Sequence, residues 1–158
     1  MREYLTYDDV NIVPKYSELE SRSDVDLTTN LTKNIKLQIP IISSPMDTVT
    51  EYDMAYGMWN HGGIGFIHRF MEIDKQSKMI LNLKKEIESH WKGMKDLDIS
   101  NKQWFENPPL GAAIGVTEDW FERAQELVKN GCNVLLIDVA HGHHKLVGEA
   151  IEKIKTKL

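Results

Sequence analysis

Cysteine is almost missing from this chain of 158 residues, and Cys132 is the only one. A single thiol excludes an intrachain disulfide and a metal cluster built on cysteines. Long apolar runs are missing too, since no 18 consecutive apolar residues occur that could cross a bilayer as a helix. The N-terminus, Met1 to Tyr4, lacks the apolar core of a signal peptide. These absences predict a cytoplasmic protein that does not act at a membrane.

Basic residues are in the minority. The chain has 19 lysines and arginines against 24 acidic residues, which gives a net charge of −5. This balance argues against a nucleic-acid partner, although it leaves room for a local anion pocket. The length suits one domain but is short for a complete eight-stranded α/β barrel of about 250 residues.

The stretch from residue 40 to residue 68 organises the chain. Thr50 is predicted to be the N-cap of a helix, with Asp53 as its acidic capping-box partner. This helix lies between an apolar strand at residues 40–42 and a second strand at residues 64–67, and Gly62 and Gly63 end it. Strand, helix, strand units build parallel sheets, which place their chemistry in the loops that follow the strands.

The remaining sequence extends this pattern in both directions. Upstream, apolar residues alternate with polar ones around Leu27 and Leu37, which predicts a hairpin that covers the bottom of a barrel. Downstream, the predicted elements are a helix at 73–89, an aperiodic connector at 91–109, a strand at 110–115, a helix capped by Thr117, a strand at 134–137 and a helix at 146–158. The fold prediction is α/β, with an arm and hairpin (1–39) before four β/α units (40–158). That is the N-terminal half of a (β/α)8 TIM barrel, with open parallel edges.

Five segments carry a family resemblance: LTYDDV (5–10), ISSPMDTVTE (42–51), GGIGFIH (62–68), GAAIGV (111–116) and IDVAHGH (137–143). They resemble IMP dehydrogenase and its sister, GMP reductase. The resemblance implies a (β/α)8 barrel that binds a purine nucleotide (IMP or GMP) and a nicotinamide cofactor, NAD or NADP, at the C-terminal ends of its strands. This chain resembles the first four units only, and the connector stands where many dehydrogenases carry CBS modules.

The resemblance also implies what this half lacks. The nucleophilic cysteine loop, the glycine-rich phosphate loop, the mobile flap and the site of the monovalent cation K+ belong to the second half. No catalytic residue is therefore expected in this chain, and the expected partner is a C-terminal half-barrel chain or a second copy in a homo-oligomer. Cys132 lies at a helix-to-strand junction, away from the chemistry, and is not the nucleophile.

Two residues match family positions that contact the nucleotide, Ser44 and Met46. A serine hydroxyl can bond phosphate or ribose, and a methionine can pack against a flat base. The alternatives are a serine that bonds its own loop and a methionine in the core. Asp47 is predicted to fix the loop.

The resemblance assigns the cofactor to other loops. Asp138 matches the aspartate on the nicotinamide ribose, with Val139 and Ala140 along the cofactor path through their backbone. The alternative for Asp138 is a cap for the next helix. Arg69 and the pair Ser21-Arg22 match positions near the NADPH phosphates, and the pair reaches in from a neighbouring subunit. The alternative is two exposed arginines.

Two further features carry weaker predictions. His141, His143 and His144 lack a carboxylate partner, so we interpret them as loop residues and predict no metal site. Thr117 matches a position near the adenine in some relatives, and its predicted role as N-cap explains it equally well.

The choice of enzyme rests on the resemblance alone. The motifs at 42–51 and 62–68 favour the dehydrogenase, whereas Ser21-Arg22, Arg69 and the missing CBS modules favour the reductase. We expect an IMP dehydrogenase-like half that is inactive alone, with GMP reductase as the alternative. Further alternatives are a non-catalytic, self-associating nucleotide-binding module and a fragment without a function of its own.

Overall fold

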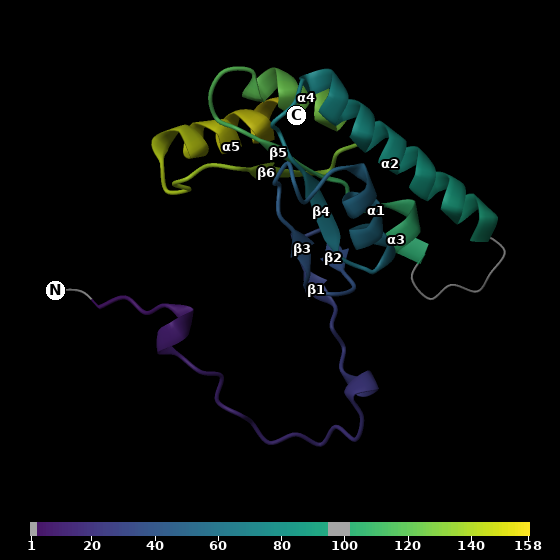
Figure 1. Ribbon diagram of the computed structural model, residues 1–158, viewed down its shortest axis with the longest axis vertical. Coiled ribbons are helices and arrows are strands. Elements are labelled where there is room, and N and C mark those ends of the chain that lie inside the picture. Colours follow the sequence, from purple (N-terminus) through teal and green to yellow (C-terminus); the bar gives the residue numbers. More distant parts are fainter. Residues whose placement is uncertain (1–2, 95–101) are drawn as a thin grey trace.

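The computed structural model describes residues 3–94 and 102–158 (Figure 1). At its centre is a parallel sheet with the strand order β3-β4-β5-β6. The strands are β3 (Ile42–Ser43), β4 (Ile64–Ile67), β5 (Gly111–Ile114) and β6 (Val134–Ile137). The helices are α1 (Tyr52–Asn60), α2 (Ile73–Met94), α3 (Lys102–Glu106), α4 (Trp120–Lys129) and α5 (Lys145–Lys157). The predicted α/β architecture with a four-stranded parallel sheet is confirmed. No helix of the described ranges is both long and apolar enough to span a membrane.

The strand order follows the sequence, so each crossover moves one strand along in the same direction. Helix α1 packs against β3 and β4, α2 packs against β4 and β5, and α4 packs against β5. At Gly65 the helix and the sheet approach closely, because a Cβ there would lie 2.8 Å from the Ala55 Cα. The glycine in this strand is therefore required by the packing of α1.

The predicted hairpin forms with short strands, β1 (Thr29–Asn30) and β2 (Lys36–Leu37). Leu37 is buried, and the N–H groups of Gln38 and Ile39 both donate to the Gly62 carbonyl. Gly62, with a φ of +88°, lies in the turn that leads into β4. The hairpin therefore lies at the N-terminal edge of the sheet, opposite the ends of the strands where the predicted site residues follow.

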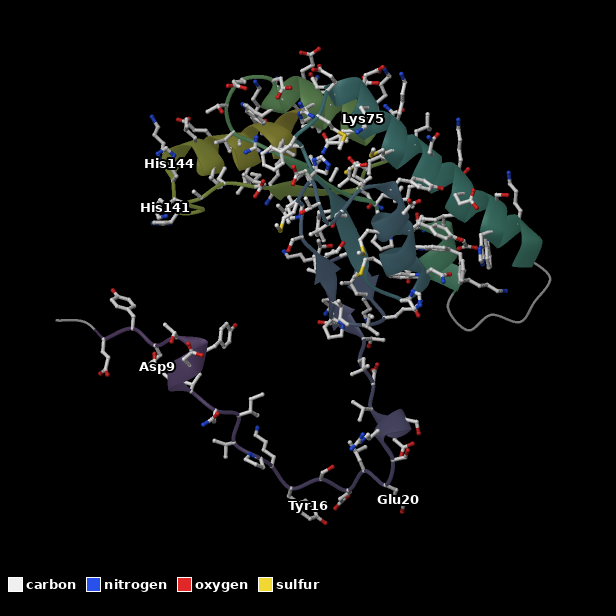
Figure 2. All side chains as sticks on the ribbon, viewed as in Figure 1. Asp9, Tyr16, Glu20, Lys75, His141 and His144 are labelled. Atoms are coloured by element: carbon white, nitrogen blue, oxygen red, sulfur yellow. The ribbon has the colours of Figure 1, made fainter. Side chains whose placement is uncertain are left out.

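Before the hairpin, the chain is an extended arm. It contains two 3₁₀ turns, η1 (Tyr7–Asp9) and η2 (Arg22–Asp24). Figure 2 shows Asp9, Tyr16 and Glu20 on this arm, which runs away from the body of the protein. The side chain of Tyr16 is 89% exposed, so the arm is not part of the core.

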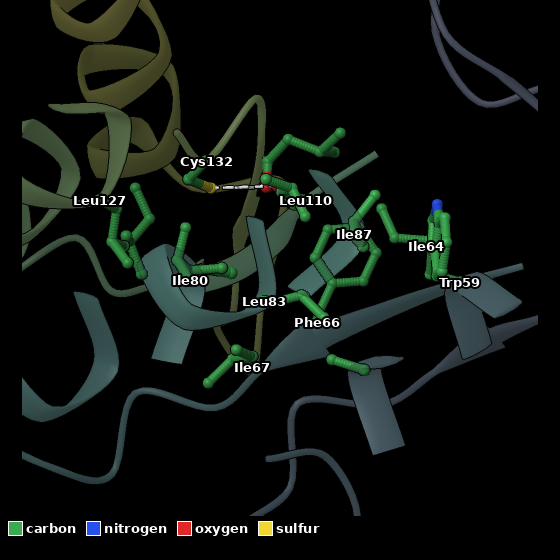
Figure 3. Close-up of a cluster of buried hydrophobic side chains, with 14 of the residues drawn as sticks. Trp59, Ile64, Phe66, Ile67, Ile80, Leu83, Ile87, Leu110, Leu127 and Cys132 are labelled. Atoms are coloured by element: carbon green, nitrogen blue, oxygen red, sulfur yellow. Dashed lines mark hydrogen bonds between the residues drawn. The ribbon is translucent and has the colours of Figure 1, made fainter. Parts of the chain in front are cut away.

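The core lies between the sheet and the helices (Figure 3). The helical spacing of Ile80, Leu83 and Ile87 predicts a buried stripe on α2, and all three side chains are fully buried. Leu127 comes from α4, and Cys132 closes the cluster with its thiol 3.3 Å from the Leu110 carbonyl oxygen. The periodicity of the sequence thus identified the buried faces of α2 and α4.

Both predicted threonine caps are wrong. Helix α1 has Glu51 at its N-cap, while the fully buried Thr50 donates its hydroxyl to the Ser44 carbonyl and lies 2.9 Å from the Ser43 hydroxyl. Helix α4 has Asp119 at its N-cap, two residues after Thr117. Thr50 directly precedes the observed N-cap and its hydroxyl is engaged by the β3 loop, whereas a turn separates Thr117 from α4.

The predicted aperiodic connector at residues 91–109 is only partly correct. Helix α2 continues to Met94, and α3 forms within the connector, while residues 95–101 lie outside the described ranges. The Phe105 ring of α3 stacks on Trp91 and meets the edge of Trp59, at centroid distances of 5.1 and 5.7 Å. These aromatic contacts are tertiary, which explains why a local pattern did not predict the helix.

The outer strands are less covered than the sequence predicted. The uninterrupted apolar sequence of residues 134–137 predicts a strand buried on both faces, but Leu135, Leu136 and Ile137 of β6 are only partly buried. Helix α5 beside it leaves Leu146 and Leu158 exposed. The reason is position, because β6 is a sheet edge and has no further strand beside it among the described residues.

Candidate functional site

The candidate site lies at the C-terminal edge of the parallel sheet. Ser44 follows β3, Arg69 follows β4, Gly115 follows β5 and Asp138 follows β6. Since parallel strands end at one edge, these four positions come from consecutive strands and lie along the same rim of the sheet. The topology therefore gathers residues that are far apart in the sequence.

Arg69 and Asp138, two of the predicted cofactor residues, form an ion pair. The Arg69 Nε lies 3.6 Å from the Asp138 Oδ2, and each side chain is about one-third exposed, 36% and 33%. The guanidinium crosses β5 above Gly115, where a Cβ would lie 3.7 Å from it. The pair thus bridges the loops after β4 and β6.

The pair keeps hydrogen-bonding capacity. Within residues 3–94 and 102–158, the buried Nε atom of Arg69 has no hydrogen-bond partner. The backbone N–H of Asp138 donates to the Ile114 carbonyl, which fixes the loop to the end of β5. The N-cap of α5 is His144, so Asp138 does not cap that helix. Val139 is half-buried and Ala140 is exposed beside it.

Ser44 and Met46 lie in the loop after β3. Met46 is 52% exposed and therefore not a core methionine. The loop is held by its backbone and by Thr50, since the Ser44 carbonyl accepts hydrogen bonds from the Met46 N–H and the Thr50 hydroxyl. Thr50 thus has the loop-fixing role that was predicted for Asp47, whose side chain is exposed.

Ser21 and Arg22 are not brought to this site. They lie on the exposed arm, where the Ser21 hydroxyl accepts from the Ser23 N–H and the Asp24 carboxylate accepts from the Ser21 N–H. These bonds form a reciprocal cap of the turn η2. Their predicted approach to a cofactor bound by a neighbouring subunit stays a prediction.

The sequence analysis did not predict a row of interacting polar side chains beside Arg69, formed by His68, Glu51 and Lys75. His68 is buried, and its Nδ1 accepts from the Phe70 N–H at 3.1 Å, so its Nε2 carries the proton and donates to Glu51, also at 3.1 Å. Lys75 lies 3.4 Å from the same Glu51 oxygen. The hydrogen bond from His68 lowers the pKa of the Glu51 carboxyl, Lys75 adds to this, and partial desolvation opposes it.

The lowered pKa of Glu51 predicts a pH dependence. The stabilisation from the ionised Glu51 is complete above the unfolded pKa of about 4.3 and is lost as the pH falls through the lower folded pKa. Glu51→Gln should destabilise the protein at pH 7 by at most about 1 kcal/mol, since the side chain is 43% exposed. The difference from the wild type should disappear in urea unfolding series as the pH falls below 4. A difference that stays constant with pH would contradict this assignment.

Two buried polar residues were also missed, Gln76 of α2 and Arg123 of α4. Each lies on the apolar face of its helix, in line with Ile80 and Leu127 respectively. A polar side chain at an apolar position is the signal that could have identified them.

Cys132 lies just before β6, at the edge of the sheet opposite Asp138, as the sequence predicted. Its thiol is buried, and burial raises its pKa to about 12. The thiolate that reacts with disulfide reagents is therefore scarce at neutral pH. We expect Ellman's reagent to label the native chain at least about 100-fold more slowly than the urea-unfolded chain. Rapid labelling of the native chain would show that this thiol is accessible.

The three loop histidines have different surroundings. His141 and His143 are exposed, whereas His144 caps α5 by accepting from the Leu146 N–H. Figure 2 shows His141 and His144 at the outer end of the β6–α5 connection. No group of three potential metal ligands occurs among the residues that the structure describes.

Comparison with known proteins identifies relatives over the whole chain. The family model of the IMP dehydrogenase / GMP reductase domain matches residues 4–158. The inosine-5'-monophosphate dehydrogenase of Borreliella burgdorferi is 39% identical, over 99% of this chain and 46% of that protein. The corresponding enzyme of Cryptosporidium parvum is 39% identical, over 98% of this chain and 44% of that protein. A GMP reductase of Leishmania donovani is 47% identical over 52% of this chain. The chain thus spans less than half the length of the two dehydrogenases.

Proposed function

The chain belongs to the IMP dehydrogenase / GMP reductase family, and we propose that it supplies the cofactor-side and nucleotide-side loops of a purine-nucleotide oxidoreductase. The reaction that we propose is the oxidation of IMP to XMP with NAD. The ion pair between Arg69 and Asp138 carries this proposal, because it places a cation and a carboxylate side by side at the edge where parallel α/β folds bind ligands.

The residues at this edge fit a dinucleotide. The Asp138 carboxylate can accept both hydroxyls of a ribose, and the Arg69 guanidinium, whose side chain is 36% exposed, can donate to a phosphate. Val139 and Ala140 would line the cofactor path. The bound nicotinamide would exchange a hydride with the purine, and the residues of this chain would bind and orient the two ligands.

Ser44 and Met46 would hold the nucleotide on the neighbouring loop. The half-exposed Met46 can cover the face of a flat base, and the Ser44 hydroxyl can bond phosphate or ribose. From a second copy, Ser21 and Arg22 would reach the cofactor phosphates. The K+ ion of the family would bind outside this half.

We propose that the 158 residues form half of a (β/α)8 barrel and do not turn over substrate alone. Support comes from four consecutive parallel strands with uncovered outer positions, such as Ile42, which is 48% exposed on β3. A C-terminal half-barrel chain, or a second copy, would cover these edges. The residues that we propose to bind at the sheet edge are present, whereas the nucleophilic cysteine loop that the resemblance implies would come from the second half.

The test is reconstitution. The chain is refolded with the matching C-terminal half of a dehydrogenase such as the Borreliella burgdorferi relative, and IMP and NAD are added. We expect the absorbance of reduced cofactor to rise in the mixture and in neither half alone. A Ser44→Ala chain refolded in parallel should give less activity. A co-folded pair without turnover, or turnover by this chain alone, would overturn the proposal.

GMP reductase is the second candidate, favoured by Arg69 and by the Leishmania donovani relative. In this case the reconstituted pair would consume NADPH with GMP. Arg69→Met separates the cofactors, because loss of a phosphate-binding cation should weaken NADPH binding about tenfold more than NAD binding if Arg69 contacts the additional phosphate. Equal losses in calorimetry would assign Arg69 to the shared diphosphate. A homodimer that binds nucleotide without turnover in any pair would indicate the non-catalytic alternative.

A further inference from the structure

A buried polar network lies directly behind the Arg69 loop. Gln76 of α2 is fully buried, and its Nε2 donates to two carbonyls, that of Ile67 at 3.0 Å and that of Ala113 at 2.9 Å. Ile67 is the last residue of β4, and Ala113 lies next to the end of β5. One side-chain amide therefore fastens the C-terminal ends of two neighbouring strands.

Arg123 of α4 completes the network. It is 6% exposed, and its Nη1 donates to the Gln76 Oε1 and to the Met71 carbonyl, both at 3.0 Å. Its Nη2 pairs with Asp119 at 2.6 Å. The guanidinium thus fixes which way the Gln76 amide points, and it holds the loop after β4 at a position two residues beyond Arg69.

Arg69 is therefore held between two anchors. On one side, the Phe70 N–H donates to the buried His68, and on the other side, Arg123 holds the Met71 carbonyl. The Phe70 side chain is 60% exposed and lies 4.9 Å from the Arg69 guanidinium carbon, so it packs on Arg69 without burying it. Two backbone anchors therefore flank Arg69, and the Phe70 ring packs against its guanidinium.

We infer that Gln76 and Arg123 are positioning residues that hold the β4–α2 loop so that Arg69 faces Asp138. The inference rests on the proposed function for the role of the Arg69–Asp138 pair, while the anchoring of the loop stands on the geometry alone. Without Arg123, two acceptors, the partly buried Met71 carbonyl and the buried Gln76 Oε1, lose their donor among the described residues. The loop would then open to water to satisfy them.

The test compares Arg123→Met with Arg123→Lys and a control. Methionine fills similar space without a donor, and lysine keeps the charge but satisfies fewer acceptors. The control, Lys129→Met, removes an exposed cation from the same helix, where Lys129 pairs with Glu126. Hydrogen exchange of the amides of residues 68–72 is measured, together with NAD and NADPH binding by calorimetry.

We expect Arg123→Met to speed exchange of the loop amides about tenfold and to weaken cofactor binding about tenfold. Arg123→Lys should give smaller changes in both, and Lys129→Met should give none. If Arg123→Met does not fold, the inference is tested by whether Arg123→Lys shows faster loop exchange and weaker cofactor binding than the wild type. Unchanged loop exchange, or exchange raised equally throughout α4 and β5, would overturn the inference. If the wild-type chain binds neither cofactor, the proposed function fails. Hydrogen exchange of residues 68–72 then tests by itself whether Arg123 anchors the loop.

Discussion

Asp138→Ala is expected to weaken binding of the nicotinamide dinucleotide about 100-fold. A carboxylate that accepts both ribose hydroxyls makes two charge-assisted hydrogen bonds, each contributing roughly 1.5–3 kcal/mol. Loss of about 3 kcal/mol corresponds to a change of about 100-fold in Kd. The substitution also removes the charge that Arg69 faces at 3.6 Å. Calorimetric titration of the chain with NAD and with NADPH measures the effect.

The matched control for this prediction is Asp47→Ala. It removes the same charge from the same edge of the sheet, but Asp47 is exposed in the loop after β3 and forms no ion pair among the described residues. Binding should be nearly unchanged in this variant. Wild-type affinity in Asp138→Ala would refute the role of Asp138, and an equal loss in both variants would indicate a general effect of net charge.

The sequence predicted that Arg69 and Asp138 lie at the same edge of the sheet, but it did not predict that they form an ion pair. The parallel topology and the motifs around Arg69 and Asp138 place both residues at one edge of the sheet, because strands 64–67 and 134–137 were predicted with their observed bounds. The ion pair between the two side chains depends on how Arg69 crosses β5. The guanidinium passes over Gly115, where even a Cβ would be in ordinary contact with it at 3.7 Å, and this proximity appears only when the strands are adjacent.

Polar residues inside the fold were the least predictable. Thr50 matched the pattern of an N-cap, yet its hydroxyl bonds the end of β3, because a tertiary acceptor can outcompete the local backbone for a threonine hydroxyl. Gln76 and Arg123 satisfy each other across two helices. Such pairs are invisible to a periodicity analysis that treats each helix separately, since each residue alone resembles an interruption of an apolar face.

The predicted role of the N-terminal arm depends on a second chain. Ser21 and Arg22 were predicted from the family motif to act on a neighbouring subunit, and in the single chain both are exposed. They belong to the N-terminal arm, which runs away from the sheet in Figure 1. A role that needs a second chain is not tested by the fold of one. The comparisons, by contrast, do confirm the family that the five motifs indicated, over residues 4–158.

Trp59→Ala is expected to lower the free energy of unfolding by about 3–5 kcal/mol, the usual cost of removing a buried aromatic side chain. Trp59 is 1% exposed, and its ring lies within 6 Å of three aromatic rings. These neighbours are Tyr56 of α1, His90 of α2 and Phe105 of α3. The alanine would therefore leave a cavity at the place where three helices meet, and urea unfolding followed by circular dichroism measures the loss.

Trp59→Phe separates the packing of the ring from its polar group. Within residues 3–94 and 102–158, the buried indole Nε1 has no hydrogen-bond partner, so phenylalanine removes a donor that stabilises nothing. We expect this variant to lose only about 1–2 kcal/mol, from the smaller ring volume. Hydrogen exchange should quicken in α3 and at the end of α2 in Trp59→Ala, while β4 and β5 stay protected. Equal losses in the two variants would show that the indole N–H has a partner in solution, and the end of α2 would then be held by that bond as well as by aromatic packing.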